Sequence, residues 1–194
     1  MNLARMMPCL SHEECDKVLS ARHEWRRTTV ISHKGVGINS DTRSCDGCEL
    51  KGGLEEMAHA AINKALVDWS ELIKAEYPET YECLSLPGVN NLDTYRESLN
   101  LLRYEKDQEY KWHTDQPWKT MPDGSTNSVT RMLSVVLYLN DDFQGGETEM
   151  PARLYRPEKG KALIFPSHWT YPHRARPVLS GTKYALVTWY HSRQ

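Results

Sequence analysis

The chain has 194 residues, of which 39% are hydrophobic and 26% charged, and its formal net charge is −2. This length suits a single domain, residues 1–194, with one hydrophobic core. The near-neutral balance gives no overall attraction to nucleic acid or to anionic membranes. No apolar run approaches the roughly 20 residues of a membrane span, and residues 1–10 lack a secretory signal, so we expect a cytoplasmic protein.

The N-terminal half, residues 1–94, is expected to hold supporting helices, a flexible loop and scaffold strands. Ser11, followed three residues later by a glutamate, predicts a capped helix that ends near Arg22. Residues 26–31 fit a short strand. Apolar residues at intervals of three and four between positions 54 and 75 predict a helix that packs on a sheet.

Residues 33–53 are rich in glycine, asparagine and serine, which predicts a mobile loop. Cys45 and Cys48 form a CxxC pair within it, but no second pair lies at zinc-finger distance. The chain has five cysteines at irregular spacing, which argues against a disulfide framework. We therefore interpret Cys45 and Cys48 as two thiols in a loop, with a zinc or redox role as the alternative.

From about residue 95 to residue 194 the sequence is typical of short strands separated by turns. Strands are expected at residues 99–104, 110–115, 130–139, 147–150, 160–166 and 181–189, with a loop at 116–127. Many short strands without intervening helices favour a sandwich or barrel over a parallel α/β sheet. In the strand 130–139, alternation gives Met132, Ser134, Val136 and Tyr138 one shared face, which suits a lumen that holds a polar ligand.

The chemistry of the chain centres on His113-Thr114-Asp115 and on His173. In an extended strand, His113 and Asp115 point the same way. Two imidazoles and one carboxylate on one side of a metal form the facial triad of non-haem Fe(II) oxygenases, which leaves coordination positions open. A structural zinc site would need four closed ligands. The pattern therefore predicts a catalytic iron site.

Lys183 is the second candidate for a functional residue. In the strand 181–189 it shares a face with Ala185, Val187 and Trp189, where a charged group is costly unless something pairs with it. Two interpretations remain open: the lysine reaches water from the start of the strand, or it meets a bound anion at the bottom of a pocket.

Several ordered segments carry a resemblance to a known family. They are His113-x-Asp115, Tyr138-Leu139-Asn140, Gly145-Gly146-Glu147-Thr148, Gly160-Lys161-Ala162-Leu163-Ile164-Phe165, and His173 followed by Pro177-Val178, Gly181 and Lys183. Together they resemble the iron(II)/2-oxoglutarate-dependent dioxygenases, in particular their prolyl-4-hydroxylase-like branch, over roughly residues 95–191. The resemblance implies an α+β, mainly β fold, with N-terminal supporting helices and a double-stranded β-helix (jelly-roll) catalytic core at residues 95–194.

For the cofactors, the resemblance implies that Fe(II) is held by the two histidines and the aspartate, with ascorbate as a reductant. It implies that Lys183 pairs with the distal carboxylate of the co-substrate 2-oxoglutarate. Tyr138 would be a neutral donor beside the lysine, and Tyr104 would flank the metal end; both could instead be plain core tyrosines. His168 competes with His173 for the place of third ligand, and we prefer His173 because the motif spacings start from it.

The substrate is the least defined part of the prediction. Candidates for substrate contacts are Arg131, Arg43, Trp112 and Trp169, although strand parity turns Arg131 away from the lumen and a solvated loop arginine is the default interpretation of Arg43. The resemblance implies hydroxylation of an unactivated C–H bond by molecular oxygen, first of all on a prolyl residue of a peptide or protein. Alternatives are a free amino acid, a small metabolite or a nucleic acid, the last disfavoured by the charge balance, or a catalytically silent metal- or ligand-binding barrel.

Overall fold

The computed structural model describes residues 1–32, 35–39, 41–83, 95–116, 118–120, 126–128 and 131–191. The largest sheet follows the order β1 (Arg5–Pro8), β15 (Lys161–Pro166), β11 (Arg131–Tyr138), β18 (Lys183–His191), β7 (Asn100–Tyr104), β5 (Asp46–Glu49) and β2 (Arg26–Arg27), and β6 (Tyr95–Arg96) pairs with β18. A second sheet has the order β14 (Arg153–Tyr155), β13 (Thr148–Met150), β16 (His173–Ala175) and β8 (Tyr110–His113).

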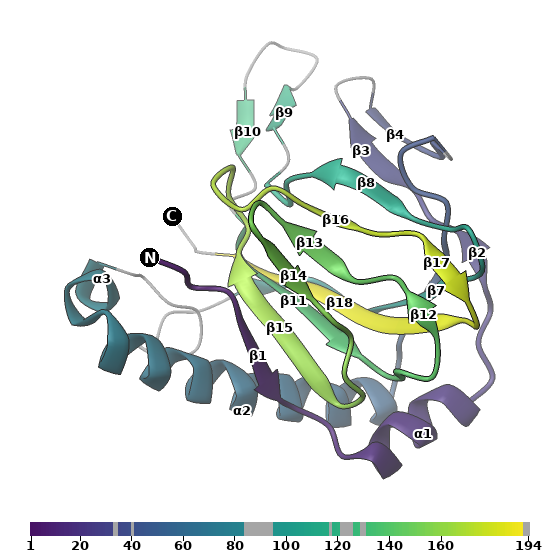
Figure 1. Cartoon of the computed structure of the whole chain (residues 1–194), viewed down its shortest axis with the longest axis horizontal. Coiled ribbons are helices and arrows are strands. Elements are labelled where there is room, and N and C mark those ends of the chain that lie inside the picture. Colours follow the sequence, from purple (N-terminus) through teal and green to yellow (C-terminus); the bar gives the residue numbers. More distant parts are fainter. Residues whose placement is uncertain are drawn as a thin grey trace.

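Three two-stranded pairs complete the strands of the described residues. They are β12 (Gln144–Gly145) with β17 (Val178–Ser180), β9 (Trp118–Thr120) with β10 (Thr126–Ser128), and β3 (Val30–Ser32) with β4 (Gly35–Gly37). Neighbouring strands in all of these sheets run antiparallel. In Figure 1 the smaller sheet lies over the larger one, which is the layering of a double-stranded β-helix and confirms the predicted fold class.

The helices support the larger sheet from outside. Helix α1 (His12–Ser20) has the predicted capping box, because Ser11 and Glu14 bond each other's main chain, and it ends two residues earlier than predicted. Helix α2 (Gly53–Glu76) runs along the sheet (Figure 1), as its apolar spacing predicts. Helix α3 (Pro78–Cys83) was not predicted, and it begins at a proline, a residue well suited to the first helical position.

One hydrophobic cluster joins α2 to the sheet. The buried helix residues Ile62 and Trp69 belong to it together with Leu133, Val135 and Leu137 of β11. Burial of each such side chain contributes about 1.5–3 kcal/mol relative to exposure. This packing holds one face of β11 against the helix, so the opposite face is left for the interior of the barrel.

Two predicted loops contain strands. The predicted loop at 33–53 contains β4 and β5. The predicted loop at 116–127 contains β9 and the first two residues of β10. Residues 33–34, 40, 117 and 121–125 of these two segments lie outside the described residues. Cys48 lies in β5, which differs from the predicted loop, whereas Cys45 lies in the connection just before β5 and is fully buried. Glycine-rich composition misled the prediction here, because β4 and β5 form although each contains glycine. No helix of the described residues is both long and apolar enough to cross a membrane.

Candidate functional site

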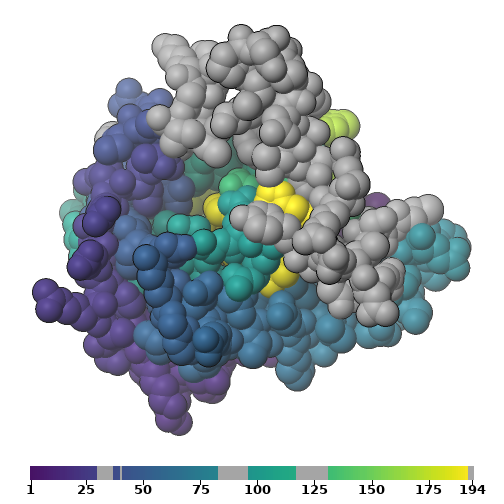
Figure 2. Space-filling view, turned by 180° about the vertical axis from the view of Figure 1, so that it is seen from behind, coloured from purple at the N-terminus to yellow at the C-terminus, as the bar shows by residue number. Residues whose placement is uncertain are grey.

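A cavity of about 460 Å³ opens within the barrel, a volume in the range of small-molecule sites. Its wall includes the face of β18 that carries Lys183, Ala185, Val187 and Trp189, as alternation predicted. Seen from the side opposite to Figure 1, teal and yellow atoms of the C-terminal half lie at the centre of the face, with the blue and purple N-terminal half beside them (Figure 2).

The predicted triad meets at one point of this cavity. The possible ligand atoms of His113, Asp115 and His173 lie within 4.8 Å of one another. Nε2 of His113 is 3.5 Å from Oδ1 of Asp115, and Nε2 of His173 is 3.5 Å from Oδ2. The histidines face each other across the β8–β16 pair, in register.

The local geometry of His113 and Asp115 differs from the predicted single strand. Strand β8 ends at His113, and Asp115 lies beyond it in a bend. The carboxylate therefore reaches the histidines because the chain turns, and not because side chains alternate along a strand.

Main-chain carbonyls orient both imidazoles. Nδ1 of His113 lies 2.7 Å from the carbonyl oxygen of Lys111, and Nδ1 of His173 lies 3.1 Å from that of Tyr171. With Nδ1 donating its proton, the lone pair of each Nε2 points to the centre of the triad. Burial lowers the pKa of His173, partly offset by Asp115, which favours the neutral, ligand-competent imidazole.

Asp115 is held as an anion. Burial alone would raise its pKa, but the adjacent His173 and His113 and a hydrogen bond from Trp189 bring the pKa well below the usual range. Ser134 of β11 donates to Oδ2 at 2.7 Å, and Ser167 lies 2.8 Å from the Ser134 hydroxyl. Ser134, on the predicted polar face of β11, thus holds the carboxylate of Asp115, the candidate metal ligand.

Lys183 is buried in the wall of the same cavity as the triad, with 2% of its surface exposed. Its Nζ donates to the carbonyl of Gly146 at 2.6 Å. Burial lowers its pKa to about 8, although Cys45 and Glu147 oppose the shift. The structure therefore excludes the interpretation in which this lysine reaches bulk water.

The two predicted tyrosines both accompany Lys183. Its Nζ lies 5.3 Å from the ring centre of Tyr104 and 5.4 Å from that of Tyr138. The Tyr138 hydroxyl lies 2.8 Å from Oγ1 of Thr148, and it is Thr148 that faces the cavity. Tyr104 is paired with Lys183 across β7 and β18, so its main chain lies beside the lysine, and its predicted place at the metal end stays a prediction.

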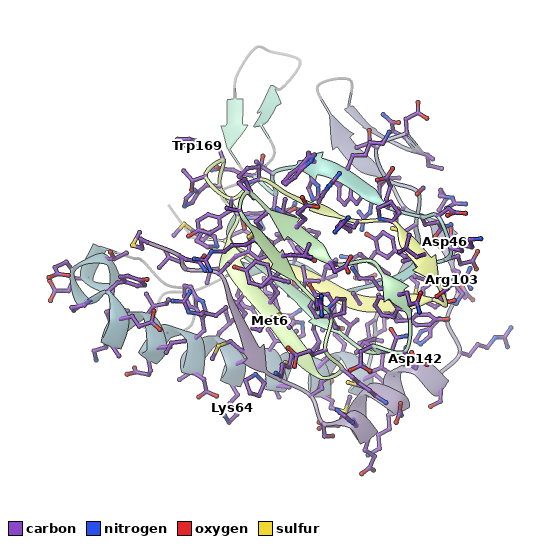
Figure 3. All side chains as sticks on the ribbon, viewed as in Figure 1. Met6, Asp46, Lys64, Arg103, Asp142 and Trp169 are labelled. Atoms are coloured by element: carbon purple, nitrogen blue, oxygen red, sulfur yellow. The ribbon has the colours of Figure 1, made fainter. Side chains whose placement is uncertain are left out.

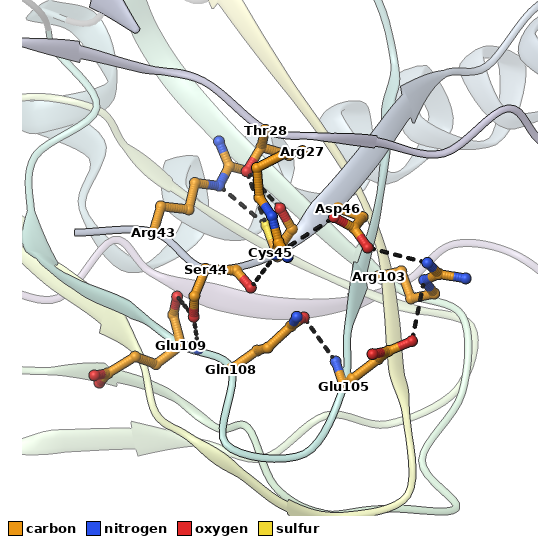
Figure 4. A network of polar contacts seen from close by, with 10 residues as sticks. All are labelled: Arg27, Thr28, Arg43, Ser44, Cys45, Asp46, Arg103, Glu105, Gln108 and Glu109. Carbon is orange, nitrogen blue, oxygen red and sulfur yellow. Dashed lines mark hydrogen bonds and ion pairs between the residues drawn. The ribbon is translucent and has the colours of Figure 1, made fainter. Parts of the chain in front are cut away.

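Of the four substrate candidates, the two arginines line the cavity. Arg43 is half-buried, and its Nε lies 3.2 Å from the buried thiol of Cys45 (Figure 4). Its guanidinium lies over the Tyr110 ring. The default interpretation of a solvated loop arginine is therefore wrong. Arg131 also faces inward, because the register shifts between Arg131 and Leu133 and reverses the parity. The same shift turns Met132 toward the hydrophobic cluster between α2 and the sheet. The prediction that Met132 shares a face with Ser134 is therefore wrong.

The two tryptophans lie outside the cavity wall. Trp112 is 46% exposed and sits under the guanidinium of Arg174, 5.2 Å from its ring centre. Trp169 is 75% exposed, in the loop after β15 (Figure 3). His168, the competing third ligand, is not part of the triad: its Nδ1 contacts Thr170.

Sequence reasoning missed Tyr110 and Glu97. The Tyr110 ring stacks on His113 with centres 3.6 Å apart, and Glu97 lines the cavity and pairs with Arg131. Tyr110 could have been found as an aromatic residue on the strand of His113. Glu97 had no local signal, since its partner is distant in sequence.

The donor set fits a divalent transition metal. Two imidazoles and one carboxylate match the ligands of Fe(II) sites with open positions, and the buried ammonium of Lys183 shares the cavity with them. A compact dianion that chelates a metal at one end would satisfy both groups. These features fit Fe(II) and 2-oxoglutarate.

Comparison with known proteins gives the same family. Residues 99–191 match the 2OG-Fe(II) oxygenase superfamily. A probable prolyl 4-hydroxylase of Arabidopsis thaliana is 26% identical over 94% of the chain and 66% of its own length. A PKHD-type hydroxylase of Psychrobacter sp. is 36% identical over 46% of the chain and 36% of its own length. The chain thus spans just under two thirds of the length of two of its Arabidopsis relatives, 66% and 65%.

Solved structures share the fold. A viral collagen prolyl hydroxylase from Paramecium Bursaria Chlorella virus-1 superposes with a TM-score of 0.63 at 19% identity, over 99% of this chain and 97% of the other. A prolyl-4-hydroxylase of Pseudomonas putida gives 0.63 at 20% identity, over 100% and 95%. With the ordered motifs and the triad geometry, these matches support a 2OG-Fe(II) oxygenase of the prolyl 4-hydroxylase-like branch.

Proposed function

We propose that the protein is an Fe(II)- and 2-oxoglutarate-dependent dioxygenase that hydroxylates a prolyl residue of a peptide or protein. The observation that carries the proposal is one cavity with two complementary sites: the triad of His113, Asp115 and His173, and the buried ammonium of Lys183. The prolyl substrate rests on relatives that include a prolyl 4-hydroxylase and a probable prolyl 4-hydroxylase of Arabidopsis thaliana, and on a structural neighbour in complex with a peptide of hypoxia inducible factor.

Each group of the cavity has a proposed task. The triad binds Fe(II), and Lys183 binds the distal carboxylate of 2-oxoglutarate and orients it. The rings of Tyr104 and Tyr138 shield the ammonium from water, which strengthens this charge pairing. When bound, Fe(II) and 2-oxoglutarate supply the oxidation of a C–H bond by molecular oxygen, with release of succinate and carbon dioxide.

Arg43 is proposed to face the substrate. It lines the cavity, and its side-chain contacts with Cys45, Tyr104 and Tyr110 do not neutralise its charge. Trp112 and Trp169 could contact a substrate only outside the cavity wall, so we assign them no contact with the reacting residue.

The test is substrate-dependent succinate formation. The purified protein is incubated with Fe(II), 2-oxoglutarate, ascorbate and a panel of proline-containing peptides, and the products are analysed by mass spectrometry. We expect one oxygen atom added per succinate formed, with loss of both signals in His113→Ala. Oxygen added only to free amino acids or metabolites would replace the prolyl substrate. Absence of 2-oxoglutarate turnover with every substrate, coupled or uncoupled, would indicate a silent binding barrel.

A further inference from the structure

Arg131 lies beside the triad, and protein groups engage its guanidinium on several sides. Nε and Nη2 donate to the two carboxylate oxygens of Glu97 at 2.6 and 2.7 Å. Nη1 donates to the main-chain carbonyl of Asp115 at 3.1 Å. The guanidinium carbon lies 3.7 Å from the ring centre of Trp189, which covers one face. Its charge is matched, so it needs no anion from a substrate.

The main-chain carbonyl of Asp115 requires a hydrogen-bond donor. It lies two residues beyond the end of β8, where the pairing with β16 has stopped, and yet it is buried with 7% of its surface exposed. A buried main-chain carbonyl outside a strand ladder is costly without a donor. Arg131 supplies that donor and so ties the main chain of the carboxylate ligand candidate to the start of β11.

Glu97 is itself fixed to β18. Its main-chain N–H donates to the carbonyl of Trp189 at 2.9 Å, and its carbonyl accepts from Oγ1 of Thr188 at 2.7 Å. Its Oε1 lies 2.7 Å from Nε2 of His191. The pair of Glu97 and Arg131 therefore links Asp115 to the strand that also carries Lys183.

We propose that Arg131, held by Glu97, is a positioning residue for the metal site. It fixes the main chain of Asp115, while Ser134 fixes the carboxylate itself at 2.7 Å. This inference rests on the proposed function, because it assumes that Asp115 binds a metal. Outer partners of this kind typically contribute about 10–100-fold to metal affinity.

The first test is the Arg131→Lys variant. Lysine keeps the positive charge, but one ammonium cannot bond both oxygens of Glu97 and the Asp115 carbonyl in the same plane. Co(II) is titrated into the protein without 2-oxoglutarate or substrate, and the visible absorption of the bound ion gives both the Kd and the ligand geometry. We expect the Kd for Co(II) to rise about tenfold, together with altered absorption bands.

Arg103→Lys is the matched control. Arg103 donates from Nη2 to Asp46 at 3.0 Å (Figure 4) and lies over the Trp25 ring at 4.7 Å, so it repeats the carboxylate pair and the aromatic contact away from the triad. This variant should bind Co(II) with a Kd within about twofold of the unaltered chain. An equal loss of affinity in both lysine variants would indicate a general effect on stability and would overturn the positioning role.

Glu97→Gln keeps the test decisive if Arg131→Lys does not fold. The amide preserves the shape of Glu97 but weakens its hold on Arg131, and we expect about a threefold rise in the Kd for Co(II). Co(II) affinity and absorption unchanged in Glu97→Gln, or in a folded Arg131→Lys, would overturn the proposal. Unchanged Co(II) binding in His113→Ala would instead contradict the metal site itself, which separates the two failures.

Discussion

The two ends of the cavity differ in how the charge of their basic residue, Arg131 or Lys183, is paired. At the triad end, Arg131 forms a two-bond pair with Glu97 and its charge is neutralised within the protein. At the other end, the contacts of the Lys183 ammonium within the described residues are one carbonyl and two tyrosine rings, and the electrostatic effect of Glu147 does not offset the effect of burial on the pKa of the lysine. A buried charge without a partner of opposite charge is costly, so an anion bound at the lysine end would pair with Lys183. Arg131 is already paired with Glu97.

Removal of a triad ligand should have the largest effect of the substitutions considered, because it should abolish metal binding. His113→Ala removes one of three converging ligands, and we expect no measurable Fe(II) or Co(II) binding by calorimetry. His168→Ala serves as control, because His168 lies near the triad in sequence but outside it in space. Retained metal affinity in His113→Ala would remove this residue from the site.

Removal of the lysine charge should leave the metal end intact. We expect Lys183→Ala to raise the Kd for 2-oxoglutarate about 100-fold, because truncating one partner of a buried charge pair costs about 2–5 kcal/mol. Metal affinity should stay within about twofold. The surface variant Lys161→Ala, whose lysine pairs with Glu158, controls for loss of a positive charge. An unchanged Kd would assign the carboxylate of 2-oxoglutarate to another residue.

The pH dependence of 2-oxoglutarate binding follows from the lowered pKa of Lys183, about 8 in the free protein. Binding needs the ammonium form, which is present below this pKa and is lost as the pH rises through it. Between pH 7 and pH 9 the Kd should rise about tenfold, since one pH unit above the pKa leaves about a tenth of the groups protonated. In Lys183→Arg the guanidinium stays charged, and its profile should be flat. A flat profile in the unaltered chain would contradict the role of the lysine charge.

The smallest effect is expected at Gly146, whose carbonyl receives the lysine. Its φ is +66°, and an added Cβ would lie 3.1 Å from Cδ of Lys183. Gly146→Ala should lower the free energy of unfolding by about 1–2 kcal/mol through the left-handed backbone and weaken 2-oxoglutarate binding a few-fold by displacing the lysine. Gly52 has the same φ with no atom within 4 Å of an added Cβ. Gly52→Ala should also lower the free energy of unfolding, with a backbone cost of its own because its ψ is −147°, and should leave the Kd unchanged; equal Kd values in the two variants would refute the displacement.

Regular strands explain what could be predicted from the sequence. On β18, strict alternation places Lys183, Ala185, Val187 and Trp189 on the cavity wall, as predicted. The capped helix at Ser11 and the long helix α2 also follow from local spacing. Here one period holds over the whole element, so a residue's face can be counted from its neighbours.

Irregular backbone explains what could not be predicted. The register shift after Arg131 reverses the parity on which its predicted outward direction depended, because a bulge adds one residue to one strand only. Asp115 reaches the triad through a bend. Glu97 meets Arg131 and His191 only through the pairing of distant strands, and no local pattern encodes such contacts. The substrate contacts stay predictions, since two of the four candidates line the cavity and two do not.

Anaerobic visible absorption of the Fe(II)-loaded protein during titration with 2-oxoglutarate tests the central claim most directly. A 2-oxo acid that chelates Fe(II) gives a charge-transfer band, so its growth reports metal and co-substrate in one cavity. We predict that the band saturates at one 2-oxoglutarate per chain, is absent in His113→Ala, and in Lys183→Ala needs a far higher 2-oxoglutarate concentration. Absence of the band in the unaltered, Fe(II)-loaded protein at saturating 2-oxoglutarate would contradict the account.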